Sequence, residues 1–344
     1  MAHNFEDNDN MFLTRTPSWH KLEQTLFEDY PTREEARAAS LPWEVTTETL
    51  YRMVPVITET GDLKETYEPI EDFKMTLRDD TNDVLGVVSS TYGTVKNSDL
   101  FDIMEGLEKA SRGGQPVRYE TGGSLKGGKK VFLLARLEEP LTIKGDPFGD
   151  TIPYYGIQNS HDGSGALRGQ ALQTRIQCDN TARAADLESQ ARGTEFVFKH
   201  TASIQDRIAD ASQALMGWRE SITHWQEMMD HLINVPVTEE NRRDFIDLFI
   251  PMPVTDKLIS DRVKNNITAA RSELAGLFQT EGLEAVANTA YGLVQGAIEW
   301  SQHYRPTKGR SELDRAENKF KRAYLDNSDL NKVAVKLVKE LVNA

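Results

Sequence analysis

The spacing of apolar residues changes character midway along the chain. Between Leu50 and Leu172, short runs rich in β-branched and aromatic residues alternate with turn-forming residues, which is typical of strands joined by tight loops. From Ile204 onward, apolar residues recur every three or four positions, which is the period of a helix with one buried face. The pattern predicts an α+β protein, in which an antiparallel β-meander with packed helices precedes a mainly helical C-terminal region.

The meander is predicted to contain eight strands and one helix. A helix at 97–110 would bury Leu100 and Phe101 on one face, with Asn97 or Ser98 as its N-cap. Asp162-Gly163 favours a hairpin between the last two strands. The strands are expected at 51–56, 72–78, 84–88, 92–95, 117–122, 129–137, 152–159 and 166–177.

The flanking regions read as helices. Before the meander, Thr32 and the acidic residues after it predict a helix that ends near Ser40, ahead of Pro42. After it, the apolar seam from Ile204 to Leu232 predicts a packed helix or coiled coil about 45 Å long, either core or subunit contact. Further helices are expected at 239–250, 255–279, 283–304, 311–324 and 328–342. We therefore predict an N-terminal arm at 1–44, a core domain at 45–200 and a helical region at 201–344.

Composition and charge narrow the function classes. A net charge of −14 over 344 residues argues against broad wrapping of duplex DNA, which depends on extensive phosphate neutralisation. The stretch from Arg112 to Arg136 is nevertheless basic, which leaves room for a confined single-strand groove. The single cysteine excludes an internal disulfide framework and fits a reducing cytoplasm. No apolar run is long enough to span a bilayer, so we expect a cytoplasmic protein without membrane contact.

Polar residues are densest around the predicted hairpin at Asp162, where the single cysteine, Cys178, also lies. Nucleophilic catalysis would need its thiolate within hydrogen-bond reach of an imidazole such as that of His161. No protease signature surrounds the cysteine, and a small residue beside a strand end is typical of buried packing. We therefore predict no catalytic residue here.

A metal-dependent nuclease would need carboxylates gathered around a divalent ion. Turn geometry accounts for Asp162 before Gly163, and helix capping would account for Asp179. The histidines are scattered and form no metal-binding spacing. We therefore expect no metal and no cofactor. The acidic residues weighed for this role are Asp146, Asp150, Asp162, Asp179 and Asp186.

Positive charge gathers in the predicted turn that contains Lys126, Lys129 and Lys130. The surrounding glycines lack the spacing of a nucleotide-binding phosphate loop, and a strand follows them, so ATP binding is not expected. Contact with a nucleic-acid backbone requires only positive charge and exposed N–H groups, which such a turn would offer. The alternative, a soluble loop whose lysines are merely hydrated, stays open.

Arginines form the second basic group. Arg168 and Arg175 lie on the last predicted strand, and Arg183 would lie one turn into a helix opened by Asn180 and Thr181. Helix N-terminal amides and guanidinium groups together favour an anion, although an internal salt-bridge network would use the same residues. We expect ligand contact, because a polar turn adjoins them. The full set of predicted nucleic-acid contacts is Lys126, Lys129, Lys130, Asn159, Ser160, His161, Arg168, Arg175, Asn180 and Arg183.

The central passage resembles a phage- and plasmid-associated family whose domain has no assigned function. That family carries an N-S-H-D-G-S turn followed by R-x-x-C-x-N-T, which residues 159–164 and 175–181 match. Weaker likenesses occur at 17–20, 92–97, 122–134 and 290–321. The chain departs from the pattern at Asp179, where a neutral polar residue is expected, and this weakens an anion-binding role there.

The order of short strands, one helix, a meander and a closing helix also resembles the single-strand-annealing proteins of phages and their ring-forming eukaryotic relatives. This resemblance implies a nonenzymatic protein that binds single-stranded DNA, forms a homo-oligomer and acts in recombination in the bacterial host cytoplasm. Fold likeness alone does not establish activity. Two alternatives stay open: a metal-dependent nucleic-acid-processing enzyme acting through Asp162 and neighbouring carboxylates, or a phage interaction protein that binds a host factor with its acidic surface.

Overall fold

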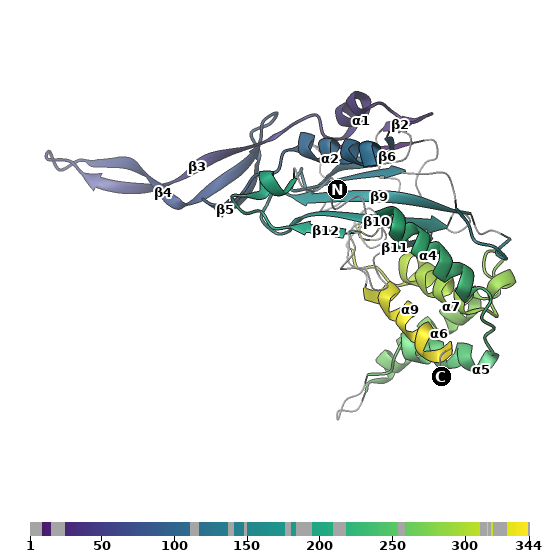
Figure 1. The fold of residues 1–344 in the computed structure, drawn as a ribbon. Coiled ribbons are helices and arrows are strands. Elements are labelled where there is room, and N and C mark those ends of the chain that lie inside the picture. The colour runs from purple at the N-terminus through teal and green to yellow at the C-terminus, as the bar shows by residue number, and fades with distance from the viewer. Residues whose placement is uncertain are drawn as a thin grey trace. The chain divides into compact units, whose positions relative to one another are not determined.

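The computed structural model of the chain describes residues 9–14, 25–110, 117–136, 141–147, 150–175, 180–183, 195–208, 218–253, 259–309, 315, 318 and 329–342 (Figure 1). The chain forms two compact units, each assembled from separate segments. Unit 1 comprises residues 1–135, 157–169 and 196–215, and unit 2 comprises residues 136–156, 170–195 and 216–344. The predicted boundaries at 44 and 200 divide the chain into consecutive segments. Each of the two units is instead assembled from three segments that are separate in sequence.

Both helices and strands are present, which confirms the predicted α+β class. The larger sheet has nine strands in the order β11-β10-β9-β7-β6-β1-β2, with β12 beside β10 and β8 beside β9. Strand β1 pairs parallel with β2 and antiparallel with β6. The bounds are β1 Met11–Thr14, β2 Thr25–Phe27, β6 Arg118–Leu125, β7 Lys130–Arg136, β8 Leu141–Thr142, β9 Asp150–Ser160, β10 Leu167–Arg175, β11 Asn180–Arg183 and β12 Glu195–Phe198.

A second, three-stranded sheet belongs to unit 1. Its antiparallel strands are β3 Val45–Ile57, β4 Leu63–Arg78 and β5 Val84–Ser89. Strand β5 pairs only with the last part of β4, from Phe73 to Leu77, so the outer parts of β3 and β4 form a two-stranded arm (Figure 1). The arm reaches much further than the short strands predicted at 51–56 and 72–78.

Two helices of unit 1 follow the sequence prediction closely. Helix α1 spans Arg33–Ser40 and begins with a capping box, in which Thr32 accepts from the Glu35 amide and the Glu35 carboxylate accepts from the Thr32 amide. Helix α2 spans Asn97–Ala110, as expected. It buries Leu100 and Phe101 in a core that also contains Phe12, Tyr119 and Phe132.

The C-terminal region is mainly helical, as predicted. Every residue of α7 is buried, and this helix continues directly into a π-helical turn, η5. None of the described helices combines the length and apolar character that a bilayer crossing requires. The bounds are α4 Trp218–Leu232, α5 Glu239–Phe249, α6 Asp261–Leu277, η4 Glu284–Val286, α7 Ala290–Glu299, η5 Trp300–Tyr304 and α9 Asp329–Val342.

Two predicted elements are wrong. Residues 92–95 form no strand, because Tyr92 and Gly93 are used in side-chain and backbone contacts with His200 rather than in a ladder. Residues 180–183 form strand β11 rather than a helix start, because they pair with β10 in register, Arg175 opposite Asn180. Residues 209–217 of the predicted seam, and most of the predicted helix at 311–324, lie outside the described residues.

Candidate functional site

The polar turn between β9 and β10 is held by its own side chains. The Asp162 carboxylate accepts hydrogen bonds from Ser160 Oγ at 2.5 Å and from the Ser164 amide at 2.9 Å, while Gly163 adopts a left-handed φ of 76°. Burial raises the pKa of Asp162, but these hydrogen bonds and the charge of Lys130 outweigh it and leave that pKa below its usual value. The turn therefore presents a fixed carboxylate.

His161 is the centre of this turn and is only 1% exposed. Its Nε2 lies 3.0 Å from Asn97 Oδ1, and Asn97 Nδ2 donates to the Trp43 carbonyl at 2.9 Å. Because that amide nitrogen is already donating, Asn97 Oδ1 is the acceptor and His161 Nε2 carries the proton. Nδ1 then accepts the longer contact, 3.5 Å, from Asn159 Nδ2. The imidazole is a neutral structural bridge between the turn and the start of α2.

Burial, reinforced by nearby His200, lowers the pKa of His161 to about 3. Its backbone is equally occupied, since its carbonyl accepts from Thr76 Oγ1 and its amide donates to the Lys129 carbonyl, both at 2.8 Å. The side chains of Asn159, Ser160 and His161 are at most 3% exposed. In this conformation they shape the turn from inside, and direct contact with a nucleic-acid strand by these three stays a prediction.

The basic turn, Lys126 to Lys130, joins β6 to β7. Three successive residues, Lys126, Gly127 and Gly128, have left-handed φ values of 60°, 66° and 93°. Such a run points successive amides into one concavity that suits an anion. Here the Asp9 carboxylate fills it, accepting from the Gly127 and Gly128 amides at 2.8 and 2.9 Å and from Ser124 Oγ at 2.7 Å.

Because Asp9 already binds the amides of this turn, those amides are not open to a phosphate group. Sequence reasoning expected exposed N–H groups, but those of Gly127 and Gly128 are bound to Asp9. Any phosphate contact must therefore come from the half-buried lysine side chains themselves.

The basic turn and the polar turn lie side by side. The His161 amide donates to the Lys129 carbonyl, and the charge of Lys130 acts on Asp162. Beneath them, the Trp43 indole packs so close to Gly128 that an added Cβ would lie 2.7 Å from the ring. The Arg78 guanidinium lies 4.4 Å from the centre of the same indole. The turn that carries the lysines is thus tightly packed against Trp43 and Arg78, and we call this packing its rigid base.

Of the three predicted arginines, Arg168 shares unit 1 with the lysines, whereas Arg175 and Arg183 belong to unit 2. Arg168 lies on the unit 1 part of β10, half-buried. Arg175 stands opposite Asn180, and Arg183 opposite Leu172, in the β10–β11 ladder of unit 2. Because 180–183 is a strand, the helix N-terminus predicted there is wrong, and anion contact by Arg175, Asn180 and Arg183 stays a prediction.

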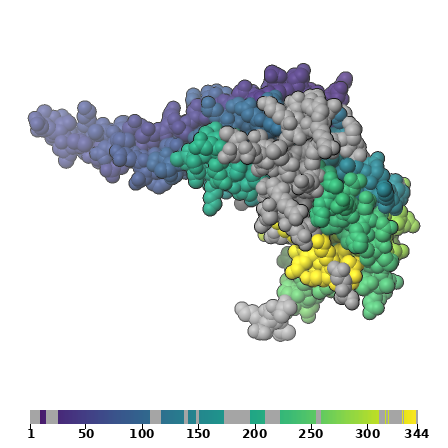
Figure 2. Space-filling model, viewed as in Figure 1, coloured from purple at the N-terminus to yellow at the C-terminus, as the bar shows by residue number. Residues whose placement is uncertain are grey.

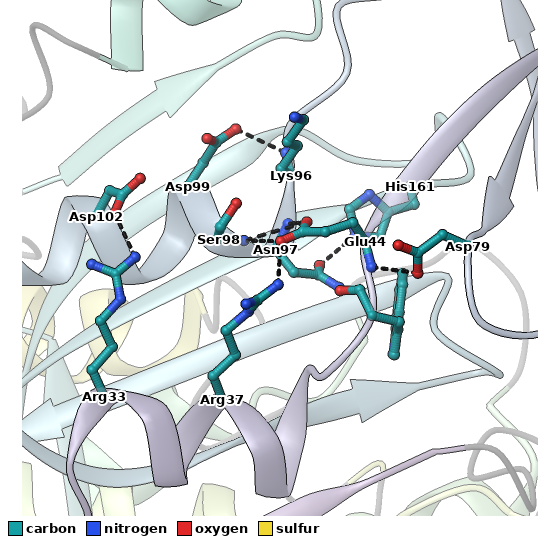
Figure 3. A network of polar contacts seen from close by, with 11 residues as sticks. Arg33, Arg37, Glu44, Asp79, Lys96, Asn97, Ser98, Asp99, Asp102 and His161 are labelled. Carbon is teal, nitrogen blue, oxygen red and sulfur yellow. Dashed lines mark hydrogen bonds and ion pairs between the residues drawn. The ribbon is translucent and has the colours of Figure 1, made fainter.

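A carboxylate that sequence reasoning missed anchors α2 (Figure 3). Glu44 accepts from the Asn97 amide at 2.7 Å and the Ser98 amide at 3.1 Å, and its carboxylate pairs with Arg37 at 2.8 Å. The Asn97 side chain is therefore not the predicted N-cap but is released to bind His161. No local pattern could reveal this cap, because Glu44 lies 53 residues before Asn97 in sequence.

The carboxylates weighed for metal binding are engaged separately. Asp146 accepts from the Tyr291 hydroxyl at 2.9 Å, and Asp150 accepts from Thr142 Oγ1 at 2.7 Å. Among the residues that the structure describes, no three His, Cys, Asp or Glu side chains gather as metal ligands would. Cys178, Asp179 and Asp186 lie outside the described part of the chain.

Comparison with known proteins identifies a family without an assigned activity. No curated protein and no solved structure matches the chain. A family model described as a domain of unknown function, DUF932, matches residues 84–324, which include α2, the basic turn, the polar turn and α7. Since this match covers more than half of its length, the chain belongs to the DUF932 family.

Proposed function

We propose that this protein binds single-stranded nucleic acid and anneals it without catalysing a reaction. The observation that carries the proposal is the basic turn, where Lys126, Lys129 and Lys130 stand on a rigid base beside the polar turn. In a chain of net charge −14, a local cluster of this kind gives a confined electrostatic site rather than a broad one. A confined site suits a single strand, whose backbone can bend to follow it.

The backbone conformation of Lys126 supports a role beyond solvation. A left-handed φ of 60° is strained for a residue with a β-carbon, and glycine or asparagine would adopt it at less cost. Strain of this kind persists where the side chain has a use, and it is typical of binding sites. We infer that Lys126 is retained for its charge.

The wider setting is part of the same proposal. The resemblance in the central passage supports a phage or plasmid origin and a place in recombination within the bacterial cytoplasm. Annealing needs an extended surface on which one strand is held while another is sampled, so the proposal includes a homo-oligomer.

Removing the basic turn's charge should weaken single-strand binding and flatten its salt dependence. Changing Lys126, Lys129 and Lys130 together to alanine removes up to three phosphate contacts, so the slope of log affinity against log salt should fall by up to about 2. A salt series measured by fluorescence anisotropy on a labelled oligonucleotide gives this slope. The matched control changes Lys264, Lys308 and Lys336 to alanine, which alters net charge equally in unit 2. An equal loss of slope in both variants would remove this turn from the site.

Lys126→Gly separates binding from folding. Glycine relieves the left-handed strain, so the free energy of unfolding should rise by about 0.5–1 kcal/mol while single-strand affinity falls. Urea unfolding and the same anisotropy assay provide the two readings. Unchanged affinity in the stabilised variant would show that the Lys126 side chain has no part in binding.

Magnesium distinguishes the proposal from its alternatives. Salt-sensitive binding to single strands, without cleavage in the presence or absence of magnesium, supports annealing. Magnesium-dependent cleavage would instead establish the nucleic-acid-processing enzyme, and the absence of binding to both single-stranded and duplex DNA would favour the host-factor partner.

A further inference from the structure

The arm formed by the outer parts of β3 and β4 exposes an apolar face that the nucleic-acid proposal does not use. Residues directly opposite in an antiparallel ladder share a face, as do residues two apart in one strand. The register therefore places one set of side chains together. That set consists of Tyr51 opposite Pro69, Met53 opposite Tyr67, Pro55 opposite Glu65 and Ile57 opposite Leu63.

Most of this face is open to solvent. Tyr51, Met53, Ile57, Leu63 and Tyr67 are between 55% and 73% exposed. Scattered exposed apolar residues need no explanation, but a contiguous row on one face of a strand pair marks an interaction surface. A two-stranded ribbon is also marginally stable in water unless its apolar face is covered.

The arm is nevertheless well formed to its tip. The Thr58 amide donates to the Asp62 carbonyl at 2.8 Å, and the Thr58, Thr60 and Asp62 side chains are linked by hydrogen bonds. On the opposite face, Arg52 pairs with Glu68 at 2.6 Å. A preformed surface loses little conformational entropy on binding, so this geometry suits docking.

The charge of the arm limits what can cover it. Residues 51–72 contain six acidic and two basic residues, which disfavours a nucleic-acid backbone. Among the paired positions of the apolar face, Glu65 carries the only charge. Two such faces can therefore meet while most of the acidic side chains remain in water.

The edges of the arm are poor sites for an added strand. Pro55 in β3 and Pro69 in β4 have no N–H to donate to a neighbour, so extension of the sheet from either edge is obstructed. Face-to-face packing avoids this obstacle. Five large side chains, each more than half exposed, would bury on the order of 500 Å² per copy, and a total near 1,000 Å² is about the lower limit for a stable dimer.

From these observations we propose that the apolar face of the arm is the contact between two copies of this chain, packed face to face about a two-fold axis. A surface of this kind is self-complementary, because the same row of side chains meets itself across the axis. The proposal does not depend on nucleic-acid binding, and self-association can be measured without any ligand.

The test uses two double variants on the same strand. Met53→Glu with Ile57→Glu places two carboxylates on the apolar face, whereas Val54→Glu with Val56→Glu places the same two charges on the opposite face. Net charge is therefore identical in the two proteins, and only the face differs. Sedimentation velocity over a concentration series measures the association of each.

We expect the wild-type chain and the Val54/Val56 variant to dimerise at micromolar concentration. The Met53/Ile57 variant should dissociate at a concentration at least about 100-fold higher, since each lost anchor costs roughly tenfold. Far-ultraviolet circular dichroism confirms that each variant is folded. Two outcomes would overturn the proposal. If the wild-type chain stays monomeric at 100-fold above micromolar, the arm binds a different partner. If all three proteins associate equally, the copies meet through a different surface.

Discussion

Changing His161 to glutamine is expected to destabilise the protein at neutral pH and also to reduce its sensitivity to acid. Glutamine can still donate to Asn97 but leaves a gap beside Trp43, so the free energy of unfolding should fall by about 2–4 kcal/mol at pH 7. Urea unfolding followed by tryptophan fluorescence gives this value.

The acid dependence follows from the pKa of His161, which is about 3 when folded and about 6.5 when unfolded. Between these values the unfolded chain binds a proton that the folded chain excludes, so stability falls as pH falls. One such group contributes roughly 1.4 kcal/mol per pH unit, and the glutamine variant should lose this part of the slope between pH 6 and pH 4. Burial also lowers the pKa of His200, which makes His200→Gln a matched comparison of the same sign.

Parallel stability curves for the wild-type protein and the His161→Gln variant from pH 7 to pH 4 would contradict a buried neutral imidazole. Nuclear magnetic resonance gives an independent check, because the His161 ring protons should not titrate above pH 4.

Adding one methyl group at Gly86 is expected to distort the polar turn. A Cβ at this position would lie 2.7 Å from the Asp162 Cα, and both backbones are fixed, Gly86 by pairing with Thr76 and the turn by the Thr76 hydroxyl. Gly86→Ala should therefore lower the free energy of unfolding by about 2–3 kcal/mol. It should also weaken single-strand binding if the two turns act together.

The same substitution in α6 supplies the control. A Cβ at Gly276 would meet nothing within 4 Å, so Gly276→Ala should raise stability by about 0.5–1 kcal/mol through helix propensity. Urea unfolding compares the two variants directly. Equal, small effects would mean that β5 and the polar turn are not in close contact.

Local signals predicted the elements that local forces define. The capping residues around α1, the apolar stripe of α2 and the Asp-Gly hairpin each depend on neighbours in sequence, and all three were found where expected. The arm was underestimated, because residues 63–71 mix charged residues and proline with few β-formers and gain their strand conformation from pairing with β3. Tertiary pairing likewise turned 180–183 into a strand.

The sequence predicted which turns carry the candidate residues, but it did not predict how these residues are oriented, and their role in binding stays a prediction. Lysines next to glycines predict a turn, which the structure contains, but its position beside the polar turn follows from contacts between residues distant in sequence. The sequence does not show whether a polar side chain at the end of a strand faces the core or the solvent. The burial of Asn159 and His161 was therefore not predicted. The His161 side chain is stabilised by a hydrogen bond with Asn97 and by ring packing against Trp43. Both residues are distant in sequence, so the local pattern could not predict these contacts.

The interleaving of the two units limits how the protein can be divided. The chain crosses between them five times, and β9 and β10 each contribute residues to both. No contiguous fragment therefore contains one complete unit without residues of the other. Truncation variants therefore cannot assign a role to one unit. The roles of the lysines and the arm have to be separated by point substitutions in the whole chain.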